Sequence, residues 1–280
     1  MRELNVKEIE DAVREMCISS NYNLPADIYK KLSESVDNEE SAIGKGILKN
    51  ILINADLAKK NRVPICQDTG MAILFIEIGQ EVCLLGGDFE EAVNEGVRKG
   101  YSEGYLRKSI VRDPLLRDNT GDNTPAVIHL KIVPGDRVKI VVAPKGFGSE
   151  NMSRIKMLKP SDGMKGVEDF VLQAVSEAGP NPCPPIFVGV GIGGTFEKVA
   201  EMAKRALLRE VEDKNPDPSL AEMETRLFEK INDLGIGPQG LGGRTTALAV
   251  KVETYPTHIA GLPAAVAINC HATRHEERIL

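Results

Sequence analysis

Helical and strand-like segments are interspersed along this chain without a repeating strand–helix–strand order, and this limits the folds open to it. The first sixty residues carry apolar side chains three and four positions apart, which is the spacing of helices that bury one face. Helices are therefore predicted over residues 6–19, 26–36 and 41–60. We expect a mixed α/β (α+β) fold, with a helical N-terminal region ahead of interspersed strands and helices.

The later elements are predicted from the same patterns and from turn residues. Asp88 is the predicted N-cap of a helix that begins at Phe89. Residues 127–133 and 137–143 flank Pro134-Gly135-Asp136, and this arrangement predicts a β-hairpin. The other predicted strands are 71–78, 186–190, 246–253 and 264–269, and the predicted helices are 89–104, 164–177, 195–209 and 219–234. We expect a single domain over residues 1–280, divided into a helical portion, 1–62, and a ligand-binding portion, 63–280.

Composition excludes several classes of protein. The chain has 280 residues, 42% hydrophobic and 27% charged, as in an ordinary globular protein. It has no run of 18 apolar residues and residues 1–7 mix both charge signs, so neither a transmembrane helix nor a signal peptide is expected. A net charge of −6 offers no basic field for nucleic acid. Five cysteines, an odd number, fit a reducing cytoplasm better than a disulfide framework.

Three cysteines have neighbours that disfavour a regular helix or strand. They are Cys66 in Ile65-Cys66-Gln67-Asp68-Thr69-Gly70, Cys183 in Asn181-Pro182-Cys183-Pro184-Pro185, and Cys270 in Asn269-Cys270-His271-Ala272-Thr273-Arg274. All three lie at the ends of apolar runs, in the kind of segment that carries functional residues. Three thiolates without an obvious fourth suggest an iron–sulfur cluster with one open iron, because four cysteines would close every iron. An open iron can act as a Lewis acid on a substrate.

The other two cysteines fit a packing role, which is the more common one for a cysteine. Cys17 continues the apolar stripe of the first predicted helix, and Cys83 lies in the short apolar run Val82-Cys83-Leu84-Leu85. Neither has a polar neighbour that would activate its thiol.

Three glycine-rich segments also need a physical reason, because glycine costs backbone entropy. Residues 145–151 follow a predicted strand, where the main chain could approach an anion and Lys145 adds charge. Residues 189–195 link a strand to a helix, but their spacing departs from the dinucleotide-binding pattern and no acid follows about twenty residues later. Residues 235–246 fit packing turns and a site-lining or subunit-facing role about equally.

Six segments together resemble class I fumarate hydratases, in the half of the family that carries the cluster. They are residues 66–70 (CQDTG), 119–126 (NTGDNTPA), 145–151 (KGFGSEN), 191–195 (GIGGT), 237–243 (GPQGLGG) and 269–274 (NCHATR). They occur in order, so the resemblance covers nearly the whole chain. In two-chain members this half is the alpha subunit, and it is shared with L(+)-tartrate dehydratase.

The resemblance implies a cofactor and a substrate site. Cys66, Cys183 and Cys270 match cysteines that hold a [4Fe-4S] cluster, whose fourth iron binds the hydroxyl and a carboxylate of a small 2-hydroxy diacid. The matching substrate-binding residues are Gln67, Asp68, Arg107 and Gly148. His271 would help to hold the site or serve as a structural histidine.

The chemistry of these residue types agrees with the implied reaction, the reversible hydration of fumarate to (S)-malate. Adding water across a double bond flanked by carboxylates needs a base, a Lewis acid and cations for the carboxylates. Arg107 offers a planar fork for a carboxylate, which Lys108 could not reproduce. Asp68 is the candidate acid that protonates the departing hydroxyl.

The resemblance also implies a partner. Single-chain members continue into a second domain that supplies a threonine-containing base site, further arginines and a lysine, whereas this chain ends at Leu280. We expect it to be active only with a separate beta subunit, in an α2β2 heterotetramer.

Three alternatives stay open. The first is an L(+)-tartrate dehydratase alpha subunit, which needs the same cluster and carboxylate-binding groups. The second is a non-catalytic module in which Cys66, Cys183, Cys270 and His271 close a zinc site, although zinc ligands normally come in close-spaced pairs. The third is a regulatory subunit that has lost its chemistry, against which the intact Cys66-Gln67-Asp68 and Arg107 argue.

Overall fold

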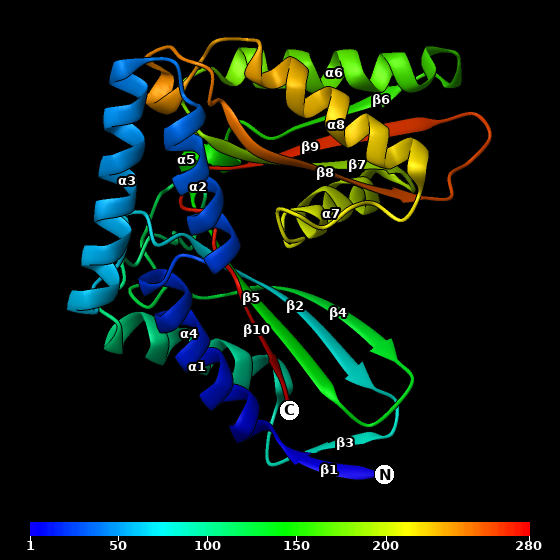
Figure 1. Ribbon diagram of the computed structural model, residues 1–280. Helices are drawn as coiled ribbons and strands as arrows, with labels where there is room; N and C mark the ends of the chain where they lie inside the picture. Colours follow the sequence, from blue (N-terminus) through cyan, green and yellow to red (C-terminus); the bar gives the residue numbers. More distant parts are fainter. The chain divides into compact units, whose positions relative to one another are not determined.

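The computed structural model describes residues 1–280 and confirms the predicted mixed α/β class (Figure 1). The elements of the first part of the chain are β1 (Arg2–Asn5), α1 (Val6–Tyr22), α2 (Ala26–Asn38), α3 (Ala42–Asn61), β2 (Met71–Gly79), β3 (Val82–Leu85), α4 (Phe89–Glu103), β4 (Val127–Val133), β5 (Val138–Lys145) and α5 (Phe147–Glu150). Those that follow are β6 (Arg154–Leu158), the 3-10 helix η1 (Pro160–Asp162), α6 (Gly163–Ala178), β7 (Ile186–Gly193), α7 (Phe196–Ala206), α8 (Pro218–Asn232), η2 (Pro238–Gly240), β8 (Ala247–Tyr255), β9 (Leu262–Asn269) and β10 (Glu276–Ile279). No helix is both long enough and apolar enough to span a membrane.

The chain forms two compact units, each assembled from separate stretches of sequence. Unit 1 comprises Met1–Leu24, Asn54–Phe147 and Arg274–Leu280, and unit 2 comprises Pro25–Ile53 and Gly148–Thr273. The single domain expected over residues 1–280, with its portions 1–62 and 63–280, stays a prediction.

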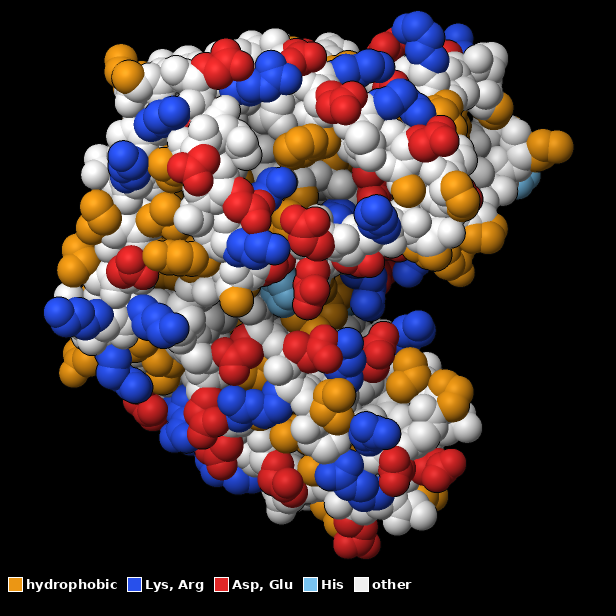
Figure 2. All heavy atoms as spheres, viewed as in Figure 1, with side chains coloured by type: hydrophobic (Ala, Val, Ile, Leu, Met, Phe, Trp, Pro, Cys, Tyr) orange, Lys and Arg blue, Asp and Glu red, His pale blue; other side chains and the backbone are white.

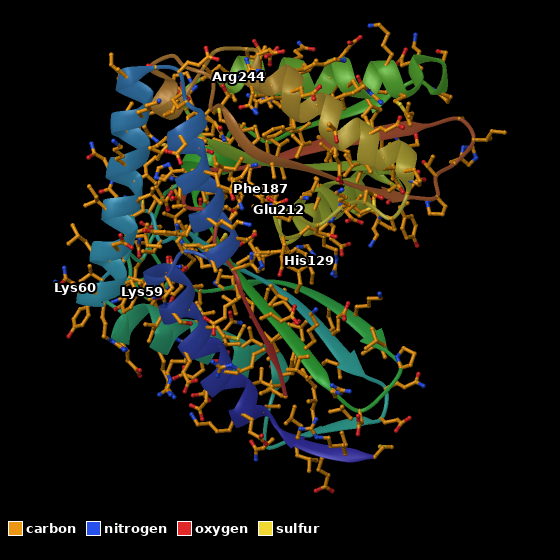
Figure 3. The ribbon with its side chains drawn as sticks, viewed as in Figure 1. Lys59, Lys60, His129, Phe187, Glu212 and Arg244 are labelled. Atoms are coloured by element: carbon orange, nitrogen blue, oxygen red, sulfur yellow. The ribbon has the colours of Figure 1, made fainter.

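Unit 1 is built on a four-stranded sheet in the order β10-β5-β2-β4. Alternate residues of β2, among them Leu74 and Ile76, are fully buried in one core with side chains of α1 and α4. The two helices approach closely because Gly96 lies where they meet: a Cβ at this position would be 2.6 Å from the carbonyl oxygen of Glu10. At the edge of the sheet, His129 of β4 stacks on Phe75 with ring centroids 4.8 Å apart (Figure 3).

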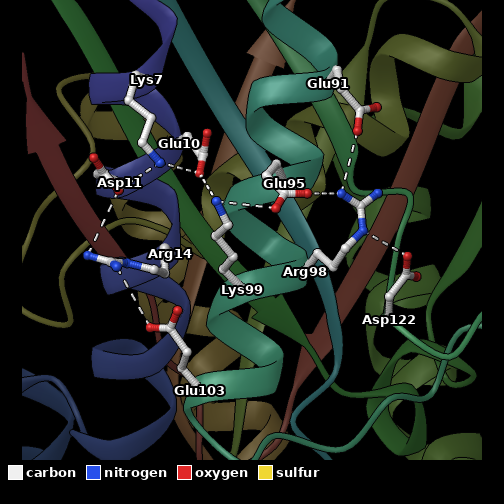
Figure 4. Close-up of polar contacts among 10 residues, drawn as sticks. All are labelled: Lys7, Glu10, Asp11, Arg14, Glu91, Glu95, Arg98, Lys99, Glu103 and Asp122. Atoms are coloured by element: carbon white, nitrogen blue, oxygen red, sulfur yellow. Dashed lines mark hydrogen bonds and ion pairs between the residues drawn. The ribbon is translucent and has the colours of Figure 1, made fainter.

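Ion pairs fasten α1 to α4 and α4 to the loop before β4 (Figure 4). The Glu10 carboxylate accepts from Lys7 at 2.5 Å and from Lys99 at 2.6 Å. Arg98 of α4 donates to Asp122 at 3.0 Å, so the loop that contains Asp122 is held against this helix.

The predicted hairpin between β4 and β5 is wrong. Both strands form, but β2 lies between them, parallel to β4 and antiparallel to β5. The end of β2 enters the turn, where Gly79 N–H donates to the Arg137 carbonyl at 2.8 Å and Gln80 N–H to the Val133 carbonyl at 2.8 Å. Only glycine fits at position 79, because a Cβ there would be 2.3 Å from the Gly135 carbonyl oxygen. Residues 134–136 do connect the two strands, but each strand pairs with β2, which is distant in sequence, and not with the other.

Unit 2 has three layers around a sheet in the order β6-β9-β7-β8. Figure 1 shows α6 and α8 over one face of this sheet and α7 over the other. Val188 and Val190 of β7 belong to the core with α6 and α8. Gly189 and Gly191 face α7, where a Cβ would lie 2.1 Å from the Ala203 carbonyl oxygen and 2.3 Å from that of Val199, respectively. These glycines therefore serve close strand–helix packing, which accounts for this segment without a nucleotide.

Candidate active site

The loop after α3 in unit 1 carries the first group of predicted site residues. Cys66 and Gln67 are exposed, and Asp68 is half-buried. The N–H of Asp68 donates to the Sγ of Cys66 at 3.4 Å, so the backbone supports the thiol directly. Cys66 and Asp68 are thus brought together by a turn of two residues.

The Asp68 carboxylate is held at both oxygens. Oδ1 accepts from the N–H of Gly70 at 3.1 Å, and Oδ2 accepts from the N–H of Phe147 at 2.8 Å. Gly146 leaves room for the carboxylate, since a Cβ there would lie 3.1 Å from Oδ2. Two backbone donors therefore fix the direction of this group.

Three buried side chains hold the same loop through its backbone carbonyl groups. The Arg274 guanidinium donates to the carbonyl of Asp68 at 2.8 Å. The Tyr101 hydroxyl lies 2.8 Å from the carbonyl oxygen of Thr69. The Asn123 amide donates to the carbonyl of Gly70 at 3.1 Å. Since these three side chains are 5%, 0% and 0% exposed, the loop is rigid although it belongs to no helix or strand.

Arg107 lies beside this loop in unit 1. Its side chain is exposed, while its backbone N–H donates to the Thr69 hydroxyl at 2.9 Å. The next backbone groups, the N–H of Ser109 and of Ile110, donate to Asn123 Oδ1 at 2.7 and 3.2 Å. The structure thus attaches the segment that carries Arg107 to the loop that carries Asp68.

Unit 2 contains the other two predicted ligands, and it brings them together. The backbone N–H of His271, next to Cys270, donates to the carbonyl of Cys183 at 3.3 Å. The Nδ1 of His271 lies 3.1 Å from that carbonyl oxygen and 3.1 Å from the amide nitrogen of Gln239. Gly148 is nearby, because a Cβ there would lie 3.7 Å from the carbonyl oxygen of Asn181. The His271 ring therefore joins the Cys183 and Cys270 segments, as a structural histidine would.

The remaining cysteines differ from these three. Cys17 is fully buried on α1, and burial raises the pKa of its thiol to about 12. Cys83 lies in β3. The packing role predicted for Cys17 agrees with its place in the unit 1 core.

The thiols of Cys66, Cys183 and Cys270 are of the chemical type that binds iron–sulfur clusters. Cys66, Cys183 and Cys270 all lie outside helices and strands, and each is exposed or half-exposed. Hydrogen bonds to sulfur, such as the one at Cys66, are among the features that tune such clusters. Cys66 belongs to unit 1 and the other two to unit 2. Within neither unit do three His, Cys, Asp or Glu side chains lie close enough to hold a metal.

Residues 10–278 match the family described as Fumarate hydratase (Fumerase). The chain belongs to this family. It is 43% identical over 277 residues to a Methanocaldococcus jannaschii protein provisionally named L(+)-tartrate dehydratase subunit alpha, covering 95% of each chain. It is 34% identical over 272 residues to the L(+)-tartrate dehydratase subunit alpha of Escherichia coli strain K12, covering 96% of this chain and 89% of the relative.

Membership of the Fumerase family makes the chain a hydro-lyase and confirms the resemblance seen in the sequence. The roles of individual residues stay predictions. Two surface pockets of about 370 and 340 Å³ are lined by none of the predicted site residues, so neither is taken as the substrate site.

Sequence reasoning missed the side chains that support the site, namely Thr69, Tyr101, Asn123 and Arg274. Three of them occur inside segments that carried the resemblance, which was the only signal available. Their function depends on contacts between residues 31 to 206 positions apart, and no local pattern predicts such contacts.

Proposed function

We propose that this chain is the alpha subunit of a two-chain [4Fe-4S] hydro-lyase that hydrates fumarate reversibly to (S)-malate. The observation that carries the proposal is the loop of residues 66–70. There a cysteine thiol, a carboxylate fixed by two N–H groups and the backbone of Arg107 are linked by hydrogen bonds. Membership of the Fumerase family supports the same reaction class.

We assign the following roles to residues of this chain. Arg107 binds one substrate carboxylate through its guanidinium fork. Gln67 and the backbone at Gly148 contact the substrate. Asp68 gives its proton to the departing hydroxyl and takes one back in the reverse direction. Cys66, Cys183 and Cys270 would hold the cluster, which would supply a Lewis-acidic iron for the substrate hydroxyl.

L(+)-Tartrate is the second candidate substrate, with oxaloacetate and water as products. The names of the relatives favour it, because both are L(+)-tartrate dehydratase alpha subunits by name. Both reactions remove or add water next to a carboxylate, so the same cluster and Arg107 would serve either. Rates on fumarate, (S)-malate and L(+)-tartrate, measured on one preparation, decide between them. Fumarate hydration would make this an enzyme of the tricarboxylic acid cycle. The proposed compartment is the cytoplasm, because its reducing conditions suit exposed thiols.

The proposed partner is a beta subunit that supplies the base and further carboxylate-binding residues, in an α2β2 assembly. The designation "subunit alpha" of the relatives supports a second chain. So does the surface of α3, where Ile43, Ile53 and Leu57 are 63%, 55% and 50% exposed. Figure 2 shows hydrophobic side chains along this helix, interspersed with basic ones. If the chain alone matched the rate of a co-expressed pair, the partner proposal would be wrong.

The cluster is tested by anaerobic reconstitution of the co-expressed pair, followed by iron and acid-labile sulfide analysis and a visible spectrum. We expect about four irons and four sulfides per alpha chain. The Cys183→Ser variant should lose them, and the control Cys83→Ser should keep them. Asp68→Asn should retain the cluster spectrum and lose turnover. Zinc in place of iron, or an active Asp68→Asn enzyme, would contradict the proposed mechanism.

A further inference from the structure

We infer that Thr69 is a positioning residue that sets the direction of Arg107 toward the substrate carboxylate. The inference rests on the proposed function, because it assigns a support to one of the proposed substrate-binding residues. Thr69 itself is 1% exposed and does not reach the surface where a substrate would bind.

Thr69 bonds to both backbone groups of Arg107. Its hydroxyl accepts from the Arg107 N–H at 2.9 Å and donates to the Arg107 carbonyl at 3.2 Å. A hydroxyl can do both at once, because it is a donor and an acceptor in a single atom. These two hydrogen bonds satisfy the N–H and the C=O of Arg107, as a neighbouring β-strand would.

The backbone at Arg107 has no regular structure to hold it. Helix α4 ends at Glu103, and Tyr105 turns the chain with a φ of +52°. Leu106 is then drawn into the core, 4% exposed, with its N–H bonded to the Tyr101 carbonyl at 3.0 Å. Arg107 follows in a segment outside any helix or strand, so its direction depends on the Thr69 hydroxyl.

Thr69 is itself fixed relative to Asp68. Its N–H donates to the Gln67 carbonyl at 3.2 Å, and its carbonyl oxygen lies 2.8 Å from the Tyr101 hydroxyl. The Asp68 carboxylate is held within the same turn by the N–H of Gly70. Thr69 therefore joins the proposed proton donor and the proposed carboxylate ligand in one frame.

Removing the hydroxyl should leave the fold intact. Asn123 is 0% exposed and still holds the N–H groups of Ser109 and Ile110. The segment therefore stays attached two residues further on, and the disturbance is confined to Arg107. This separates a positioning effect from general unfolding.

The test uses the cluster-reconstituted pair of subunits, assayed with fumarate and with L(+)-tartrate. Thr69→Val removes the hydroxyl at nearly constant volume, and Thr69→Ser keeps it. We expect Thr69→Val to raise KM about tenfold while kcat changes by less than about threefold. The serine variant should restore the wild-type KM to within about threefold, because it keeps both hydrogen bonds. Thr225→Val is the matched control, since that hydroxyl is exposed on α8 and bonds only to the Ala221 carbonyl of its own helix.

The decisive measurement is the combination with Arg107→Ala, which alone should raise KM about a hundredfold. If Thr69 acts through Arg107, the double variant has the KM of Arg107→Ala. A further tenfold rise in KM in the double variant, relative to Arg107→Ala, would overturn the positioning role. A wild-type KM in Thr69→Val would overturn it as well. Thr69→Ala replaces Thr69→Val if circular dichroism shows that the valine variant does not fold. A wild-type pair that turns over neither substrate would instead overturn the proposed function.

Discussion

Replacement of Glu39 by glutamine should destabilise unit 2 strongly, because the carboxylate binds four backbone N–H groups at once. Glu39 follows α2 and is 1% exposed. Its Oε1 accepts from Glu40, Ser41 and Arg244 at 2.9, 3.0 and 2.9 Å, and its Oε2 accepts from Thr245 at 2.7 Å. The carboxylate thereby ties the end of α2 to the glycine-rich loop ahead of β8, in which Arg244 lies (Figure 3).

The pKa of Glu39 gives the size of this effect. Burial alone would raise it, but the hydrogen bonds from Ser41, Arg244 and Thr245 outweigh burial and lower the pKa from 4.5 to about 2. At about 1.4 kcal/mol per unit, this corresponds to about 3 kcal/mol of folding free energy. Since the folded-state pKa is depressed, the contribution is fully present above about pH 4.5 and is lost as the pH falls through about 2.

Urea unfolding followed by far-ultraviolet circular dichroism, on the cluster-free chain with its thiols reduced, measures the effect. Glu39→Gln should lower the free energy of unfolding by about 3 kcal/mol at pH 7, because the amide keeps one acceptor oxygen and turns an N–H₂ toward donors. The difference from wild type should shrink as the pH is lowered from 5 toward 2.

Glu40→Gln is the matched control, because Glu40 is the exposed neighbour and its side chain binds none of these donors. Equal stabilities of the two variants at pH 7 would refute the reasoning. So would a difference that does not depend on pH between 5 and 2.

Two further predictions concern buried positions. Iodoacetamide at pH 8 should alkylate Cys66 of the native cluster-free chain and leave Cys17 unmodified, because burial raises the pKa of the Cys17 thiol to about 12. Mass spectrometry of the digested protein measures the labelling of each cysteine. Equal labelling of both would contradict the prediction. Gly191→Ala should cost about 1–3 kcal/mol in urea unfolding, because the added Cβ would lie 2.3 Å from the Val199 carbonyl oxygen, whereas Gly46→Ala on α3, with no atom within 4 Å, should not destabilise the chain.

Elements with local signals were predicted well. Helix α4 begins at Phe89 as expected, and Asp88 caps it by accepting from the N–H of Glu91 at 2.8 Å. The signal was sufficient because a cap and a 3.6-residue period are both contained in a few neighbouring residues.

Short strands without an apolar pattern were missed. β10 has the sequence Glu-Glu-Arg-Ile and becomes a strand because it pairs antiparallel with the edge of β5. β1 likewise pairs with β3, in parallel. Strand formation at such positions depends on a distant partner that offers unpaired N–H and C=O groups.

The sequence by itself predicted Cys66, Cys183 and Cys270 as cluster ligands, because their neighbours disfavour a regular helix or strand, and these roles stay predictions. It also determined the helices, whose hydrogen bonds are local. Only the tertiary structure decided that β2 separates β4 from β5, that His271 joins Cys183 to Cys270, and that Thr69 holds Arg107. Each of these depends on hydrogen bonds between residues far apart in the chain, and local propensity carries no information about which distant partner will satisfy them.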